Sequence, residues 1–315
     1  GTQTYTGAVT LSANTTITTT DNDVSFGATI ARDGTARNLT LNTGTGTVSV
    51  TGNVGSGAAL GIITLTQTGG TTFSGTLDAA TVTLTDTADA ADITFSGSAT
   101  IATLNTAAQP YNIVFNGAAN TITNLVTFTN TGTVTLGNGA SDSSTFNNGI
   151  TATAPSGVTL AGTIQTSGDT ISIGDGDTAI TLAANTIVDG NTAGDITLGG
   201  AINGGYSLTL NTTGTTTLSG AIGGSTALTT LTTNAGGTTV ISVDIETSST
   251  QTYNDAVTLS ADVTLTTTDS NLIFNGTVNS TDATNRALTI NLDGNGGGTS
   301  ADVIFGNATA DTIGV

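Results

Sequence analysis

The stretch TQTYTGAVTLSANTTITTTDNDVSFGATI at residues 2–30 returns as TQTYNDAVTLSADVTLTTTDSNLIFNGTV at residues 250–278. Of the 29 aligned positions, 17 are identical. A block that starts again within one chain indicates duplication of a repeating unit, and such repeats build arrays rather than one closed globule. We therefore expect residues 1–315 to form a single continuous repeat structure without an internal linker.

Short runs of alternating apolar and polar residues recur along the whole chain, among them NLTLN (38–42), TVTLTD (81–86), DITFSG (92–97) and NIVFNG (112–117). In each run Val, Ile, Leu or Phe stands two positions from the next apolar residue. This is the period of a strand with one face in a core and the other in water. Gly, Asn, Asp and Ser follow the runs, where the chain must turn. The pattern predicts an all-β fold.

A finer period is marked by Phe73, Phe95, Phe115 and Leu136, each of which precedes a pair of small residues. The steps between them are 22, 20 and 21 residues. This spacing predicts a parallel β-solenoid with coils of about 21 residues and room for about fifteen coils. Stacking in register would place the three Phe side chains in one interior column and align Asn and Thr at turns into hydrogen-bonded ladders. An array of antiparallel β-sandwich domains has similar strands and turns and stays the alternative.

Charge narrows the classes of function. The formal net charge is -19, with 22 Asp and Glu against three cationic side chains, Arg32, Arg37 and Arg286. Phosphate binding requires clustered cations, so we expect no binding to nucleic acid or to an anionic membrane surface. No apolar run approaches the ~20 residues of a membrane helix, so we expect no membrane insertion. Arg37 (RNLTLN) and Arg286 (RALTIN) share a repeat position, which favours a structural or charge-pairing role.

The composition also argues against catalysis. The chain has no His, Cys or Lys to act as base, nucleophile or Schiff-base amine. A carboxylate pair such as Asp175 and Asp177 in IGDGDT, or a calcium-assisted lyase with an arginine base, is what remains. Gly-Asp-Gly-Asp is more simply a tight turn between strands. We expect no enzymatic activity, no catalytic residue and no organic cofactor.

Calcium is the one cofactor that the sequence suggests. Acidic turns at Asp21 and Asp23 (TDNDV), at Asp175 and Asp177, and at Asp293 (LDGNGGG) place hard oxygen ligands beside flexible Gly backbone. The nine-residue GGxGxD repeat of calcium-binding β-rolls is missing, however. Solvated turn carboxylates are therefore the competing interpretation of these five residues.

Aromatic residues are few, with four Tyr and no Trp. Tyr5 and Tyr253 share a repeat position, and we expect them to pack at a coil corner; stacking on a surface glycan is the alternative role. The chain has no Cys either, which fits an extracellular bacterial protein that avoids disulfides.

The phrases ITLGGAINGGYSLTLNTTGTTTLSGAIGGSTALTTLTTNAGG (196–237) and TQTYNDAVTLSADVTLTTT (250–268) resemble repeats of very large bacterial surface proteins, the filamentous-haemagglutinin-like adhesins. The resemblance implies a right-handed β-helix with short coils, secretion to the cell surface, and a role as a stalk, fibre or adhesive rod. The secretion domain of that family is not visible in this sequence, which leaves the export route open.

Neither GTQTYTGAV (1–9) nor ATADTIGV (308–315) resembles a polar cap for a solenoid end. We therefore expect the chain to continue in a longer protein or to associate end to end. The functional prediction is an extracellular structural protein that forms a stiff rod, fibre or filament on the cell surface, with an adhesive or envelope role. A calcium-ordered surface-layer protein and a glycan-binding adhesin module are the alternatives.

Overall fold

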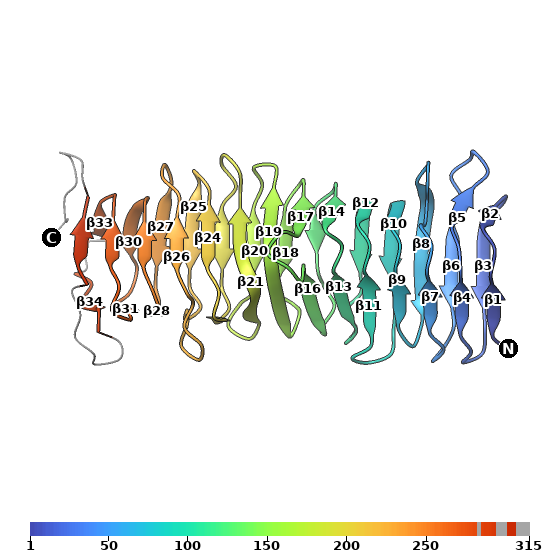
Figure 1. Ribbon diagram of the computed structural model, residues 1–315, viewed down its shortest axis with the longest axis horizontal. Coiled ribbons are helices and arrows are strands. Elements are labelled where there is room, and N and C mark those ends of the chain that lie inside the picture. Colours follow the sequence, from blue (N-terminus) through green and yellow to red (C-terminus); the bar gives the residue numbers. More distant parts are fainter. Residues whose placement is uncertain (282–284, 294–300, 307–315) are drawn as a thin grey trace. The chain divides into compact units, whose positions relative to one another are not determined.

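The computed structural model describes residues 1–281, 285–293 and 301–306 (Figure 1). The fold is all-β, and no helix occurs among these residues, so none is long and apolar enough to cross a membrane. The strands run parallel and stack as a β-solenoid of about 13 turns, with coils about 22 residues apart. The predicted solenoid is confirmed, and the antiparallel sandwich alternative is wrong.

Residues 1–159 form one compact unit. Its strands are β1 (Gln3–Tyr5), β2 (Val9–Leu11), β3 (Thr15–Thr18), β4 (Val24–Phe26), β5 (Ile30–Arg32), β6 (Leu39–Asn42), β7 (Val48–Val50), β8 (Leu60–Gln67), β9 (Thr71–Phe73), β10 (Leu77–Leu84), β11 (Asp92–Phe95), β12 (Ala99–Thr106), β13 (Asn112–Phe115), β14 (Ala119–Ile122), β15 (Val126–Thr127), β16 (Thr133–Leu136), β17 (Ser143–Phe146) and β18 (Ile150–Ala152). One ladder runs β1, β4, β7, β9, β11, β13, β16, and a second runs β3, β6, β8, β10, β12, β14, β17.

Residues 160–315 form the other compact unit. Its strands are β19 (Gly157–Thr166), which starts at the end of the first unit, β20 (Ile171–Ile173), β21 (Ala179–Asp189), β22 (Ile196–Leu198), β23 (Ile202–Asn203), β24 (Leu208–Asn211), β25 (Thr215–Leu218), β26 (Leu231–Thr233), β27 (Thr238–Ile241), β28 (Ile245–Thr247), β29 (Gln251–Tyr253), β30 (Ala256–Leu259), β31 (Val263–Thr267), β32 (Leu272–Phe274), β33 (Val278–Ser280), β34 (Leu288–Asn291) and β35 (Val303–Phe305). Three ladders run β20, β22, β25, β27, β30, β33, then β21, β24, β26, β29, β32, β35, and finally β28, β31, β34.

The chain makes fewer coils than the expected fifteen because several coils are longer than the marker spacing. Phe95 and Phe115 pair across 20 residues, whereas Val24 pairs with Val48, a step of 24 residues. The step from β20 to β22 is 25 residues, from residue 171 to residue 196. The strands keep their register in each case, and the additional residues lie in the connecting loops.

The predicted aromatic column is present. Phe73, Phe95 and Phe115 face each other in register and are at most 1% exposed. Their ring centroids are separated by 5.4 Å and 4.6 Å, and the rings are within 11° of parallel. Leu136 continues the column above Phe115. Offset stacking of this kind adds to the free energy gained from burying the rings.

The predicted corner position of the repeated tyrosines is wrong. Tyr253 is fully buried in β29 and stacks on Phe274 at 5.2 Å, and Tyr5 stacks on Phe26 at 4.9 Å. Both are therefore members of interior columns. A buried phenol requires a partner, and the Tyr253 hydroxyl donates to Oε1 of Gln251 at 2.9 Å. Desolvation by this burial raises the pKa of Tyr253.

The glycine that follows each marker residue has a steric role. In the second and third coils of the aromatic column, Gly97 and Gly117 lie against the backbone of the preceding coil. A Cβ added at Gly97 would lie 2.3 Å from the carbonyl oxygen of Gly75, and one at Gly117 would lie 2.5 Å from that of Gly97. Side chains cannot fit at these positions, which explains why the marker pattern ends in Gly.

We predict that Gly97→Ala lowers the free energy of unfolding by about 1–3 kcal/mol, because the new methyl group would overlap a carbonyl of the neighbouring coil. The matched control is Gly7→Ala, since a Cβ at Gly7 meets no atom within 4 Å. Urea unfolding followed by circular dichroism measures both variants. Equal midpoints for the two variants would contradict the steric role of Gly97.

Candidate functional site

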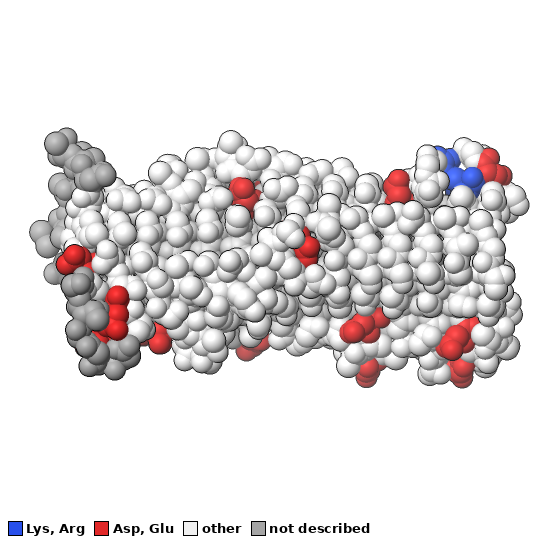
Figure 2. Space-filling view, in the orientation of Figure 1, with Lys and Arg blue, Asp and Glu red and all other residues white. Residues whose placement is uncertain are grey.

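The described residues contain no group of three or more His, Cys, Asp or Glu side chains that could hold a metal ion. The five acidic residues suggested as calcium ligands lie in three separate turns. Figure 2 shows the same dispersion over the visible face, where red carboxylates are scattered over a largely uncharged surface. The contacts of each candidate therefore have to be considered turn by turn.

Asp21 and Asp23 contact the backbone of the next coil. The Oδ1 atom of Asp21 accepts from the N–H of Thr45 at 2.9 Å, and Oδ1 of Asp23 accepts from the N–H of Thr47 at 2.8 Å and from its hydroxyl at 2.9 Å. The hydrogen bonds from Thr47 lower the pKa of Asp23. Each of these carboxylates thus joins two coils.

Asp175 forms a local turn with its own segment. Its Oδ1 atom accepts from the N–H groups of Asp177 and Thr178, both at 3.0 Å, and these hydrogen bonds lower the pKa of Asp175. This is the tight-turn geometry expected for Gly-Asp-Gly-Asp. The N–H of Asp293 donates to Oδ1 of Asn291 at 3.1 Å, and the glycine-rich segment after Asp293 lies outside the described residues. Calcium binding stays a prediction.

The most regular polar feature is a set of inter-coil bridges, in which Oδ1 of an Asn or Asp accepts a backbone N–H from the following coil. Their donor–acceptor distances lie between 2.7 and 3.1 Å. The acceptors and donors are Asn14 and Asn38, Asp21 and Thr45, Asp23 and Thr47, Asn38 and Ile62, Asn53 and Thr76, Asn112 and Thr133, Asn185 and Ser207, Asp195 and Thr215, Asn203 and Ser225, Asp244 and Thr264, Asp262 and Ala287, and Asn271 and Asp302. In all of these the acceptor precedes the donor along the chain, so the bridges share one direction.

Three contacts of the same type run the other way, with acceptors Asn120, Asn234 and Asp255. The predicted ladder of like side chains is also present in one place, where Nδ2 of Asn275 donates to Oδ1 of Asn254 at 2.7 Å. Sequence reasoning missed the bridges themselves because their donors are main-chain groups. A usable signal existed, since Asn or Asp often stands directly before the first apolar residue of a strand, as at Asp23 and Asn271.

Asp255 is the most buried carboxylate in this set and is 2% exposed. Its Oδ1 accepts from the N–H of Gly237 at 2.8 Å, and its Oδ2 accepts from the hydroxyl of Thr239 at 3.2 Å. Burial raises the pKa of Asp255 because it removes water from the charged form, and the two hydrogen bonds oppose this shift. In the other copy of the repeat this position is Gly7, which is exposed.

Arg37 confirms its expected charge-pairing role. Its Nε and Nη2 atoms donate to the two carboxylate oxygens of Asp33 at 2.8 and 2.7 Å. The guanidinium lowers the pKa of Asp33, and the carboxylate raises the pKa of Arg37. The blue cations near the N-terminal end in Figure 2 belong to this loop.

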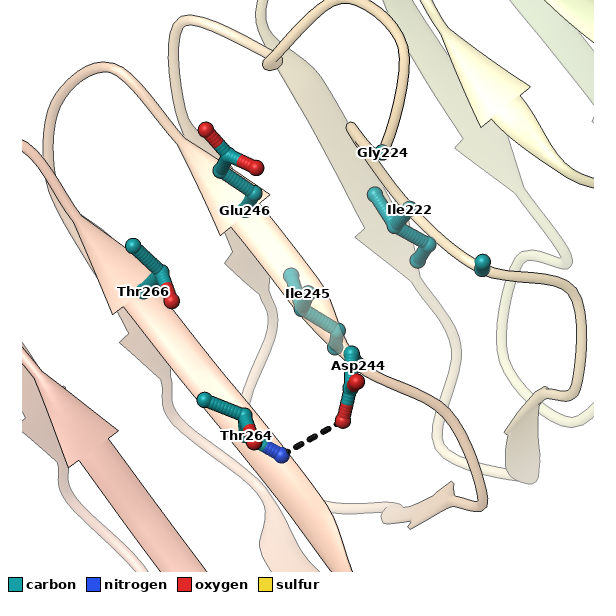
Figure 3. Close-up of a pocket in the computed structure, with 8 residues that line it drawn as sticks. Ile222, Gly224, Asp244, Ile245, Glu246, Thr264 and Thr266 are labelled. Atoms are coloured by element: carbon teal, nitrogen blue, oxygen red, sulfur yellow. Dashed lines mark hydrogen bonds between the residues drawn. The ribbon is translucent and has the colours of Figure 1, made fainter. Parts of the chain in front are cut away.

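A shallow groove of about 340 Å³ is lined by Ala221, Ile222, Gly224, Asp244, Ile245, Glu246, Thr264 and Thr266. Figure 3 shows Asp244 and Glu246 on one strand and Thr264 and Thr266 on the next. Oδ1 of Asp244 already accepts the Thr264 N–H at 2.7 Å. The groove has no aromatic lining on which a sugar ring could stack, so Glu246 is its one carboxylate without a partner among the described residues.

These features define a parallel β-solenoid protein in which side-chain amides and carboxylates join neighbouring coils. The chain matches no protein-family model, and neither the curated proteins nor the solved structures gave a significant match. The resemblance to filamentous-haemagglutinin-like adhesins therefore stays a prediction that rests on the sequence phrases alone.

We predict that Asp255→Asn stabilises the protein relative to wild type by an amount that grows as the pH rises from about 3 to about 7. The raised pKa means that the contribution of Asp255 to stability is present below the ordinary pKa of 3.8 and is lost as the pH rises through the folded-state value. Asn keeps an acceptor for Gly237 and a donor for Thr239. Chemical unfolding across this pH range measures the difference.

Asp23→Asn is the control of opposite sign. The lowered pKa of Asp23 means that its contribution is present above the ordinary value and is lost as the pH falls through the folded-state value. Asp23→Asn should therefore lose stability relative to wild type toward neutral pH. Parallel pH profiles for the two variants would contradict the assignment.

Proposed function

We propose that this chain is an extracellular structural repeat protein of the bacterial cell surface, where its coils form a stiff rod with an adhesive or envelope role. The inter-coil bridges are the observation that supports this proposal best. Each bridge fixes a side chain of one coil to the backbone of the next, so that sliding or splaying of adjacent coils would break a hydrogen bond. Twelve bridges with one direction supply this restraint in both units.

The interior supports the same role. Parallel ladders join each coil to its neighbours through backbone hydrogen bonds, and apolar columns fill the space within the coils. Separating two coils would break the ladders and expose stacked rings such as Phe95 and Phe115 together. Repeat proteins resist deformation through such nearest-neighbour contacts.

The surface supports exposure to the external medium. The net charge of -19 is dispersed among uncharged Thr, Ser and Asn side chains, which favours solubility and discourages nonspecific clumping. Catalysis is not part of the proposal because the chain lacks His, Cys and Lys, and because the groove beside Glu246 offers a single uncommitted carboxylate among the described residues.

We predict that a single chain pulled from its two ends unfolds in steps of one coil or a small number of coils. A coil of about 22 residues would release ~70 Å of extended chain, given a maximum of about 3.5 Å per residue and a coil spacing of about 5 Å. Asn38→Ala should lower the force of one step, because the Ile62 N–H loses its acceptor. Optical-tweezers extension traces measure both quantities.

Asn38→Asp is the matched control, since a carboxylate oxygen can still accept the Ile62 N–H. Identical traces for the Ala and Asp variants would contradict a mechanical role for the bridges. Extension of wild type without resolved resistance would contradict the rod. Repeating the measurement in a calcium chelator tests the calcium-ordered alternative, which requires a fall in force.

We predict that antibodies raised against this chain label intact cells of the source bacterium without permeabilisation. Immunogold electron microscopy gives the position of the label relative to the envelope, and an antibody against a cytosolic protein is the control for leakage. Labelling that requires permeabilisation would contradict the extracellular part of the proposal and leave the mechanical part to the pulling experiment.

A further inference from the structure

The strand β1 is paired on one side, by β4. The N–H of Gln3 donates to the carbonyl of Asp23 at 3.0 Å, and the carbonyl of Tyr5 accepts from Gly27 at 2.8 Å. Alternate residues of a parallel strand bond to opposite neighbours, so the N–H of Thr4 points away from β4. The N-terminal edge, defined as Thr2 to Tyr5, thus presents backbone groups suited to another parallel strand.

The sequence repeat shows what a coil does to such an edge. The strand β29 has the same Gln-Thr-Tyr sequence as β1, and it is paired on its second side by β26. Gln251 and Tyr253 are both fully buried there, whereas Gln3 is exposed and Tyr5 is partly exposed. The residues at the N-terminal edge are therefore core residues that lack a covering coil.

The neighbouring strands give the same comparison. Val257 and Leu265 are fully buried, and their counterparts Val9 and Ile17 are partly exposed. The difference cannot come from local sequence, because the two copies agree in pattern. It comes from the coil of residues 228–249, which covers the second copy.

The strand β35 presents the complementary edge. It pairs with β32 in the register Leu272 to Val303 and Phe274 to Phe305. The N–H of Leu272 donates to the carbonyl of Asp302 at 3.1 Å, and the N–H of Gly306 donates to the carbonyl of Phe274 at 2.6 Å. The N–H of Val303 therefore points away from β32. This C-terminal edge is Asp302 to Phe305.

Two side chains at this edge are suited to a following coil. Phe305 is 41% exposed although it stacks on Phe274 at 5.4 Å on its other face. Asp302 is exposed, and its carboxylate makes no hydrogen bond with the described residues. Asp302 directly precedes its strand, as Asp23 and Asn271 do, and both of those residues accept an N–H from the following coil.

We propose that the C-terminal edge of one copy pairs in parallel with the N-terminal edge of a second copy, with Val303 opposite Gln3 and Phe305 opposite Tyr5. The partner is a second copy of this chain, and the inference deepens the proposed structural function on which it rests. In this register the column Tyr253, Phe274, Phe305 of one copy continues into Tyr5 and Phe26 of the other.

The same register places the Asp302 carboxylate beside the N–H of Thr2, which directly precedes β1. That contact repeats the bridge from Asp23 to the N–H of Thr47, where each residue also directly precedes its strand. One register thus satisfies the backbone, the aromatic column and the bridge pattern. The two edges are different surfaces, so the interface is heterologous and can repeat from copy to copy.

Charge predicts the salt dependence of this pairing. Each copy carries a net charge of -19, so the copies repel one another at low ionic strength. Added salt screens that repulsion, and pairing through backbone and aromatic contacts should strengthen as the salt concentration rises.

Sedimentation velocity of the full chain over a range of concentrations tests the proposal, in ~0.5 M NaCl where the Debye length is about 4 Å. Wild type should form oligomers of increasing size. Thr4→Pro removes the outward donor of the N-terminal edge, and Val303→Pro removes that of the C-terminal edge. Each variant alone should be monomeric, and an equimolar mixture should form a dimer and nothing larger, because it contains one intact pair of edges.

A second pair of variants leaves the backbone unchanged. Asp302→Ala should raise the dissociation constant ~5- to 10-fold, and Asp302→Asn should stay within about twofold of wild type, because only Asn keeps an acceptor for Thr2. Circular dichroism and unfolding midpoints check that all variants fold. If either proline variant is unfolded, the comparison of the two Asp302 variants decides.

A wild-type chain that stays monomeric at every concentration would overturn the proposal, as would dimers of Thr4→Pro alone or equal dissociation constants for the two Asp302 variants. These results are distinguishable from failure of the proposed function. Pulling on a single tethered chain requires no association, so a monomer that resists extension would overturn the pairing and leave the structural role supported.

Discussion

Neighbouring coils approach one another at the spacing set by parallel backbone hydrogen bonds, and every other feature of the fold has to fit within that distance. The constraint is most severe at Gly97 and Gly117, where the backbone of one coil occupies the space that a side chain would need. It also explains the columns. When coils stack in register, each interior residue has an equivalent residue above and below it, and flat rings such as those of Phe95 and Phe115 fill that separation well.

The polar groups obey the same geometry. A carbonyl oxygen on an Asn or Asp side chain at a strand entrance reaches the N–H of the next coil because the two coils are so close. The carboxylates of Asp23 and Asp244 are used in this way. Acidic residues in this chain thus do structural service that their number alone does not reveal, and the same contacts lower the pKa of Asp23.

Position in the stack decides how one sequence behaves. Gln3 and Gln251 occupy the same place in the repeat, yet the first is exposed and the second bonds through its Nε2 to the carbonyl of Thr266 at 2.8 Å within the core. The exchange of exposed Gly7 for buried Asp255 shows the same dependence. The proposed pairing of β35 with β1 would give the first copy the environment that the second copy already has.

The sequence by itself determined the strands, the residues that face inward and the aromatic column of Phe73, Phe95 and Phe115, because these depend on a period of two and on a regular step between coils. Only the tertiary structure decided the partners of the acidic side chains. Asp175 bonds to its own turn and Asp23 to the next coil, although both stand in short acidic segments of similar composition. It also decided the burial of Tyr253 and the length of each coil. Those properties depend on which residues the stacking brings together across 20 to 25 positions, and nothing local to either residue records that alignment.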